Sequence, residues 1–307
     1  MSSAEVTTGP TRQVPTRQGA AVGSTSVRRV DDPPRTAGVG RFLGSELRLV
    51  LGRRRNLVLL AVLACAPIAL GIAVDVSPPG GGGDGPNFLS QVTQNGLFLV
   101  FTSLTITLPL FLPLAVAIAA GDAVAGESTA GTLRNLLVVP VGRTRLLAVK
   151  YVGILVYAAL CTLTVAVVGL VVGLVLFPHG AVTLLSGDSV PYSSALGRAA
   201  LVAVYVVVSL TGVAAIGLFV STLTEVPVAA VAAVAVLTVL SQIIDAVPQV
   251  AVLHPYLFTH PWMAFGELLR GTVAAGPLVH GVLTQLAYVV VFAAAAWARL
   301  TTKDISS

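Results

Sequence analysis

The 307-residue chain is 55% hydrophobic and only 10% charged, and its mean hydropathy is +0.92. This excludes an ordinary soluble domain, in which roughly 25% of residues are charged. The net charge of +5 does not indicate nucleic-acid binding, because ten of the eighteen cations lie before residue 56 and not along one folded face. We therefore expect an all-α polytopic protein of the plasma membrane, with no nucleic acid among its partners.

The N-terminal part of the chain differs from the rest in composition. Residues 1–38 are rich in Ser, Thr, Pro, Gly and Arg and have few large apolar side chains, which predicts a disordered cytoplasmic tail. In residues 39–55 apolar side chains such as Phe42 and Leu47 alternate with charged ones. This pattern predicts an amphipathic interfacial helix at the membrane surface, closed by Arg53 to Arg55 at the headgroups.

Six apolar windows reach the length of about 20 residues that a spanning helix needs. They are Asn56–Val74, Leu97–Ala120, Leu146–Phe177, Ala199–Leu223, Val226–Val247 and Leu278–Leu300. Together they predict a six-helix transmembrane domain over residues 56–302, followed by a cytoplasmic tail at 303–307. Pro109 and Pro113 should bend the second helix. Gly169 and Gly173 form a GxxxG motif that permits close packing of the third helix, within the chain or in a dimer.

Lys and Arg residues gather in three flanks of the predicted helices: before the first, between the second and third, and after the sixth. The positive-inside rule places such flanks in the cytoplasm. Since the number of spans is even, we expect both termini to be cytoplasmic. The cations concerned are Arg53, Arg54, Arg55, Arg134, Arg143, Arg145, Lys150, Arg299 and Lys303.

The central portions of the predicted spans carry no ionisable side chain, which argues against an ion-coupled carrier. Asp245 and His280 fall near outer helix ends, where we interpret them as interfacial. The remaining polarity inside the spans is mild, and such groups more often bond to backbone or to neighbouring helices than line a pathway. The candidates to line a substrate pathway are Thr102, Thr105, Ser209, Ser241 and Gln242.

No catalytic or metal site is expected. Ser128 lies on the cytoplasmic side and His280 near the outer side, so the two cannot form a hydrolase pair. His179, His254 and His260 fall in outer loops without partners at metal-ligand spacing. The GxxxxGK[ST] motif does not occur, so the chain cannot hydrolyse ATP through a P-loop.

The outer segment 248–277 is unusual for its aromatic residues. Tyr256, Phe258, Trp262 and Phe265 lie close together between the fifth and sixth predicted spans. Aromatic side chains of this kind are enriched at membrane interfaces, so we expect a short helix that dips into the outer headgroups.

The stretch GESTAGTLRNLLVVPVGRTRLLAVKY, residues 126–151, interrupts the apolar sequence between the second and third spans. Gly121, Gly126 and Gly131 should allow the chain to leave the membrane with unusual backbone angles. Residues 132–139 predict two turns of amphipathic helix, which Pro140 ends. We therefore expect a cytoplasmic coupling segment, whose helix contacts either lipid headgroups or a groove on a soluble partner. We place this segment at residues 121–145.

Glu127 and the stretch GTLRNLLVVPVGRTRLLAVKY follow the second of six predicted spans. This pattern resembles the permease subunit of ABC-2-type ABC transporters. The resemblance covers about residues 40–302, and only its coupling segment is specific. One departure is the loop STLTEVP at 221–227, which is too small and charge-poor for a strong second contact. The resemblance implies that the ATPase contact consists of Glu127, Gly131, Thr132, Leu133 and Arg134. It implies that the return element, which leads into the third span, includes Pro140, Arg143 and Lys150.

The resemblance also implies the working unit. A separate ABC-type ATPase subunit would bind ATP and Mg, and a second permease copy, identical or different, would complete the substrate pathway. The exported cargo would be a drug, an antibiotic, a lipid-like or another amphipathic molecule, and the chain itself would hold no cofactor. The alternative is a membrane scaffold or channel-like protein whose basic loop binds membrane lipids. A copurifying ATPase distinguishes the two.

Overall fold

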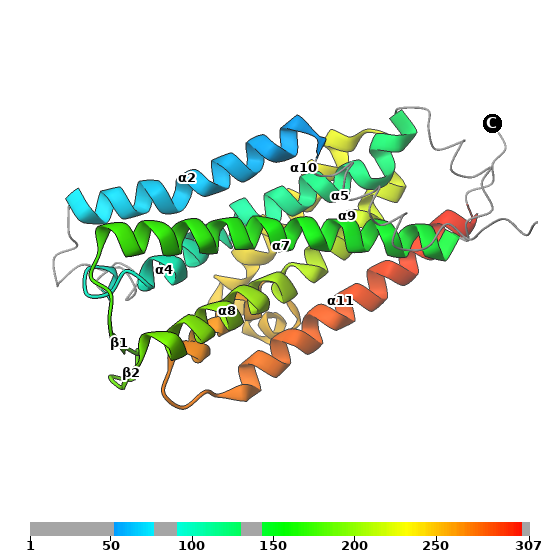
Figure 1. Cartoon of the computed structure of the whole chain (residues 1–307). Helices are drawn as coiled ribbons and strands as arrows, with labels where there is room; N and C mark the ends of the chain where they lie inside the picture. The colour runs from blue at the N-terminus through cyan, green and yellow to red at the C-terminus, as the bar shows by residue number, and fades with distance from the viewer. Residues whose placement is uncertain (1–51, 77–90, 130–142, 303–307) are drawn as a thin grey trace, which may run out of the picture. The chain divides into compact units, whose positions relative to one another are not determined.

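The computed structural model describes residues 52–76, 91–129 and 143–302, and most of them are helical (Figure 1). The predicted tails at 1–38 and 303–307, and most of the predicted interfacial helix at 39–55, lie outside these ranges. The elements are α2 (Arg54–Val76), α4 (Phe98–Thr107), α5 (Phe111–Thr129), α7 (Arg143–Leu176), β1 (Val182–Thr183), β2 (Ser189–Val190), α8 (Tyr192–Ser209), α9 (Thr211–Leu223), α10 (Pro227–Asp245), the 3₁₀ helices η1 (Pro248–Tyr256) and η2 (His260–Leu269), and α11 (Ala275–Thr302).

The long helices have the dimensions of membrane spans. Among the described residues, five helices are long and apolar enough to cross a membrane: α2, α7, the α8–α9 run, α10 and α11. The bent pair α4 and α5 gives a sixth if it is counted as one span. Large aliphatic side chains on the outer faces are exposed, as in Val228 of α10 at 73%. Water would oppose such a surface and a hydrocarbon environment would not, so the chain is a multi-pass membrane protein.

The bend predicted in the second span is confirmed. The axes of α4 and α5 differ by 55° at a break that contains Pro109. The carbonyl of Pro109 accepts a hydrogen bond of 2.6 Å from Nε2 of Gln242 in α10. Pro113 lies in the first turn of α5, where a missing N–H group costs little.

A second break, at Leu210, was not predicted. It divides the expected fourth span into α8 and α9, and α8 begins seven residues earlier than expected, at Tyr192. Side chains from other helices hold the break. The hydroxyl of Tyr151 in α7 donates to the carbonyl of Thr211 at 3.0 Å, and Oε1 of Gln285 in α11 accepts from the N–H of Gly212 at 3.2 Å.

The core lies around α4, α5 and α9. α7 packs against α2, α4 and α5, while α9 packs against α5, α10 and α11 (Figure 1). The GxxxG motif of α7 is used inside the chain. A Cβ on Gly173 would lie 2.1 Å from the carbonyl oxygen of Gly96, just before α4, and a Cβ on Gly169 would lie 3.3 Å from Cα of Val100. The motif thus allows the backbones of α4 and α7 to approach closely.

The two ends of the helix bundle differ, and we call them the basic end and the hairpin end. At the basic end, Arg53 pairs with Asp122 of α5, and the indole of Trp297 in α11 donates to Oγ1 of Thr144 in α7 at 3.1 Å. Figure 1 shows the C-terminal end of α11 beside the N-terminal end of α7. At the hairpin end, β1 and β2 pair antiparallel around a turn in which Gly187 has a φ of 89°, and the N–H of Leu185 donates to the carbonyl of Leu269 in η2.

Candidate functional site

The predicted coupling segment is described only at its two margins. Glu127 lies in the last turn of α5, and Arg143 is the first residue of α7. Residues 130–142 join these two helices and lie outside the described ranges. They include the predicted contact residues Gly131, Thr132, Leu133, Arg134 and Pro140.

The expected exit from the helix at Gly121 was wrong, because α5 continues to Thr129. Gly121 and Gly126 are both helical. Gly121 is instead a packing residue: a Cβ there would lie 2.8 Å from Cγ2 of Val231 and 3.1 Å from the carbonyl oxygen of Pro227. Its small size brings α5 against the start of α10.

Asp122 anchors this end of α5, and sequence reasoning missed it. Its side chain is 11% exposed and receives both Arg53 and Arg55 at Oδ2. These two arginines were expected at the lipid headgroups, whereas the structure turns them onto the protein. Arg54 and Arg55 also belong to α2 and not to a separate interfacial helix. The available signal was an acid placed directly after an apolar run in a chain with many nearby cations.

Ser221 forms a second anchor. Its side chain is fully buried, and its hydroxyl donates to the carbonyl of Gly121 at 2.9 Å. The same oxygen accepts from the N–H groups of Val124 and Ala125 at 3.1 and 3.0 Å. The sequence suggested that Ser221 opens a cytoplasmic loop, but it lies in the last turns of α9. One hydroxyl therefore joins the end of α9 to the backbone of α5.

Together these contacts form an anchored α5 end, which we define as Gly121, Asp122, Val124, Ala125 and their partners. It connects α5 to the residues before α2, to α9 and to α10. On the other side of the 130–142 segment, Lys150 of the predicted return element is buried in α7. Such an arrangement can transmit a displacement of the end of α5 to several helices, because close-packed interiors transmit strain.

The five candidates for a substrate pathway all have hydrogen-bond partners in the protein. Thr102, Thr105 and Ser209 each donate to the carbonyl four residues earlier in their own helix. Ser241 bonds to Oγ1 of Thr259 at 2.7 Å, and Gln242 donates to Pro109 as described above. Within the described ranges, no hydrogen bond joins two of the five.

The aromatic segment at the hairpin end folds as η1 and η2. Phe258, Trp262 and Phe265 are buried within the protein, while Tyr256 is exposed. The expected position of this segment at the outer headgroups stays a prediction. These rings fill the space between the segment and helices α8 and α11, which positions the segment. Backbone carbonyls of the segment also accept hydrogen bonds from three side chains. Tyr205 donates to Pro261 at 2.9 Å, Gln285 to Phe258 at 2.7 Å, and Tyr288 to Tyr256 at 2.9 Å.

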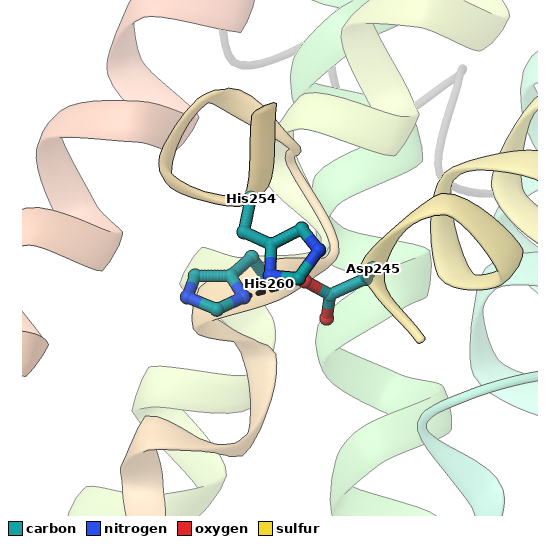
Figure 2. A group of neighbouring side chains, drawn as sticks. All are labelled: Asp245, His254 and His260. Carbon is teal, nitrogen blue, oxygen red and sulfur yellow. Dashed lines mark hydrogen bonds and ion pairs between the residues drawn. The ribbon is translucent and has the colours of Figure 1, made fainter. Parts of the chain in front are cut away.

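Three titratable side chains converge at the same end. Figure 2 shows Asp245, His254 and His260 facing one another. Nδ1 of His260 lies 2.6 Å from Oδ1 of Asp245, and Nδ1 of His254 lies 3.9 Å from the same oxygen. The expectation that these histidines are scattered without partners was wrong. The sequence spacing gave no indication, because the connection between α10 and η2 brings the three groups together.

The comparison with known families adds one match. Residues 86–306, which include every described helix except α2, match the model of a family described as "Protein of unknown function (DUF2705)". No curated protein matches the chain.

Proposed function

The chain belongs to the DUF2705 family, and we propose that it is the membrane-spanning subunit of an ATP-driven exporter of the ABC-2 type. The proposal rests on the resemblance of residues 127–150 to the coupling element of such permeases. One structural observation supports it most: the segment 130–142 joins two helices at the basic end, and one of them is the anchored α5.

In this proposal the 130–142 segment is the contact with a separate ATPase subunit, which binds ATP and Mg. Closure of the ATPase pushes the segment and with it α5 and α7. Because Ser221 and Asp122 connect α5 to α9 and to the flank of α2, the push reaches helices that lie far apart in the sequence. This chain binds, positions and moves the exported cargo, and its partner supplies the energy.

The proposed topology places the basic end in the cytoplasm and counts α4 and α5 as one bent span, which gives six spans and two cytoplasmic termini. The positive-inside rule supports this, because Arg54, Arg143 and Arg299 all belong to helix ends on that side. The hairpin end, with η1 and η2, then faces outward.

The proposed cargo is an amphipathic or lipid-like molecule. The embedded hydroxyl and amide groups considered above already bond within the protein, so they offer few free donors to a strongly polar substrate. A second copy, identical or different, completes the pathway.

The decisive experiment is copurification in mild detergent, in which the wild type should bring down an ABC-type ATPase. Leu133→Asp should abolish copurification, because a carboxylate would be buried in the partner's groove.

Arg134→Glu should leave membrane insertion intact but uncouple ATP hydrolysis from the export of lipophilic test compounds. Asp122→Asn should retain the ATPase and lower coupling, because it loosens the anchored α5 end without changing the contact segment.

The matched control is Arg270→Glu, an equal charge change at the hairpin end, where the side chain is exposed. It should leave both copurification and coupling unchanged. If no ATPase copurifies with the wild type, or if Leu133→Asp and Arg134→Glu behave as the wild type does, the proposal fails. Binding of the intact protein to anionic vesicles through the same residues would then favour the lipid-binding scaffold.

A further inference from the structure

We propose that Asp245, His254 and His260 form a binding site for one divalent transition-metal ion, with Zn²⁺ as the best match. The three residues come from separate elements: Asp245 ends α10, His254 lies in η1, and His260 begins η2. One ligand atom from each lies within 4.8 Å of the other two. The inference does not depend on the proposed export function.

The hydrogen bonds of His254 favour a metal-ligand role for its Nδ1 atom. Its Nε2 lies 3.2 Å from the carbonyl oxygen of Val247. Since a carbonyl can only accept, Nε2 carries the proton of the neutral ring and Nδ1 keeps its lone pair. That lone pair is on the side of Asp245 (Figure 2). A backbone carbonyl that fixes the tautomer of a ligating histidine is a common feature of metal sites.

The distances fit a small ion after a modest adjustment. Tetrahedral zinc with bonds of about 2.0–2.1 Å separates its ligand atoms by about 3.3 Å. The pair His260–Asp245 is closer than this, at 2.6 Å, and the pair His254–Asp245 is farther apart, at 3.9 Å. The two imidazole rings lie at 36° with centroids 5.7 Å apart. In the free site Nδ1 of His260 donates to the Asp245 carboxylate, so metal binding requires the proton of the neutral His260 ring to be on Nε2 instead. Small side-chain rotations would then open the first pair and close the second around one ion.

The chemistry of the donors selects the class of ion. Two imidazole nitrogens and one carboxylate suit zinc and its first-row neighbours, whereas Ca²⁺ and Mg²⁺ prefer sites made of oxygen. The three side chains are partly exposed, so solvent can reach them. Three protein ligands leave one position for water or for another exchangeable ligand.

Binding would strengthen the link between α10 and the segment that holds η1 and η2, which already contacts α10 through Ser241 and Thr259. η1 and η2 are already fixed to α8 and α11 by Tyr205, Gln285 and Tyr288. An ion bound to Asp245 would add a bond from the end of α10 to both His254 of η1 and His260 of η2. It would therefore close the hairpin end as a single rigid unit.

The test uses the full chain in detergent, purified with an affinity tag that contains no histidine and stripped with a chelator. Zn²⁺ is titrated against a chromophoric chelator, and Co²⁺ is added separately to record its visible absorption spectrum. We expect one ion per chain and the absorption of a low-symmetry cobalt site. Asp245→Asn, His254→Gln and His260→Gln should each weaken binding by at least about tenfold.

The matched controls are His179→Gln and His280→Gln, which remove histidines from the same end of the protein but outside the cluster. Both should bind as the wild type does. Each variant is also heated with and without Zn²⁺, because an ion that binds only the folded state raises the melting temperature. A wild type without bound metal at about 100 μM Zn²⁺, or cluster variants with unchanged affinity, would overturn the proposal. A cluster variant that melts normally without metal but is no longer stabilised by it supports the proposal.

Discussion

A single hydroxyl group connects two helices at the basic end. Ser221 Oγ bonds to one carbonyl and two N–H groups of α5, although the serine itself belongs to α9. Because Ser221 is fully buried, replacing it would remove a partner from these backbone groups at a place that water does not reach.

We expect Ser221→Ala to lower the free energy of unfolding by about 1–3 kcal/mol, because backbone groups of α5 lose a buried partner. The control is Ser209→Ala. That hydroxyl donates only to the carbonyl four residues earlier, which already takes part in the helix, so its loss should cost less than about 1 kcal/mol. Reversible unfolding in mixed micelles, followed by circular dichroism, measures both. Equal losses would contradict the special role of Ser221.

The sequence predicted the structural role of an individual residue only where a local rule applies. Pro109 could be assigned to a bend because proline lacks an N–H group wherever it stands. Asp122 could not be assigned to its arginines, because the pairing joins residues separated by 69 and 67 positions. The same limit hid the cluster of Asp245, His254 and His260, which depends on how the chain turns after α10.

Among the elements, α7 makes a close backbone contact with the residues just before α4. Gly96 and Gly173 face each other, and a Cβ on either residue would lie 2.1 Å from the carbonyl oxygen of the other. No rotation of a side chain can relieve such a contact, because both partners are backbone.

Gly173→Ala should therefore push α4 and α7 apart and destabilise the protein by at least about 2 kcal/mol, as overpacked interiors do. Gly153→Ala in the same helix is the matched control, because nothing lies within 4 Å of a Cβ at that position. It should be neutral, or stabilising by about 0.5–1 kcal/mol through the helix preference of alanine. Thermal unfolding of both variants in one detergent compares them. A tolerated alanine at 173 would show that the helices are not in backbone contact.

The helices themselves were predictable, since each predicted window overlaps a described helix and hydrophobic length alone defines it. The break at Leu210 was not predicted, although Gly212 lies two residues after it. It is held by Tyr151 and Gln285, which come from two other helices. Gly121 shows the opposite case: a glycine that suggested a turn serves helix packing instead.

For the whole molecule, the distribution of charge gives a testable orientation. His179 lies in an exposed connection after α7 at the hairpin end, and Thr302 ends α11 at the basic end. With a membrane-impermeant maleimide, His179→Cys should be labelled in intact cells, whereas Thr302→Cys should be labelled only after permeabilisation. The wild type is the blank, because Cys65 and Cys161 lie inside α2 and α7. The reverse pattern would place the basic end outside.

At this scale, composition predicted the class of protein and the order of its spans. It could not predict how the helices are connected through Asp122 and Ser221, because those contacts follow from packing and not from hydropathy. The coupling role was suggested by a short motif whose central residues lie outside the described ranges.

The placement of the two tryptophans has a practical consequence. Trp262 is 2% exposed within the hairpin end, and Trp297 is 47% exposed at the basic end. The protein thus carries one natural fluorophore at each end, in contrasting surroundings. Replacing either one with phenylalanine leaves an emission signal from a single end, so motions of the two ends can be followed separately without an attached dye.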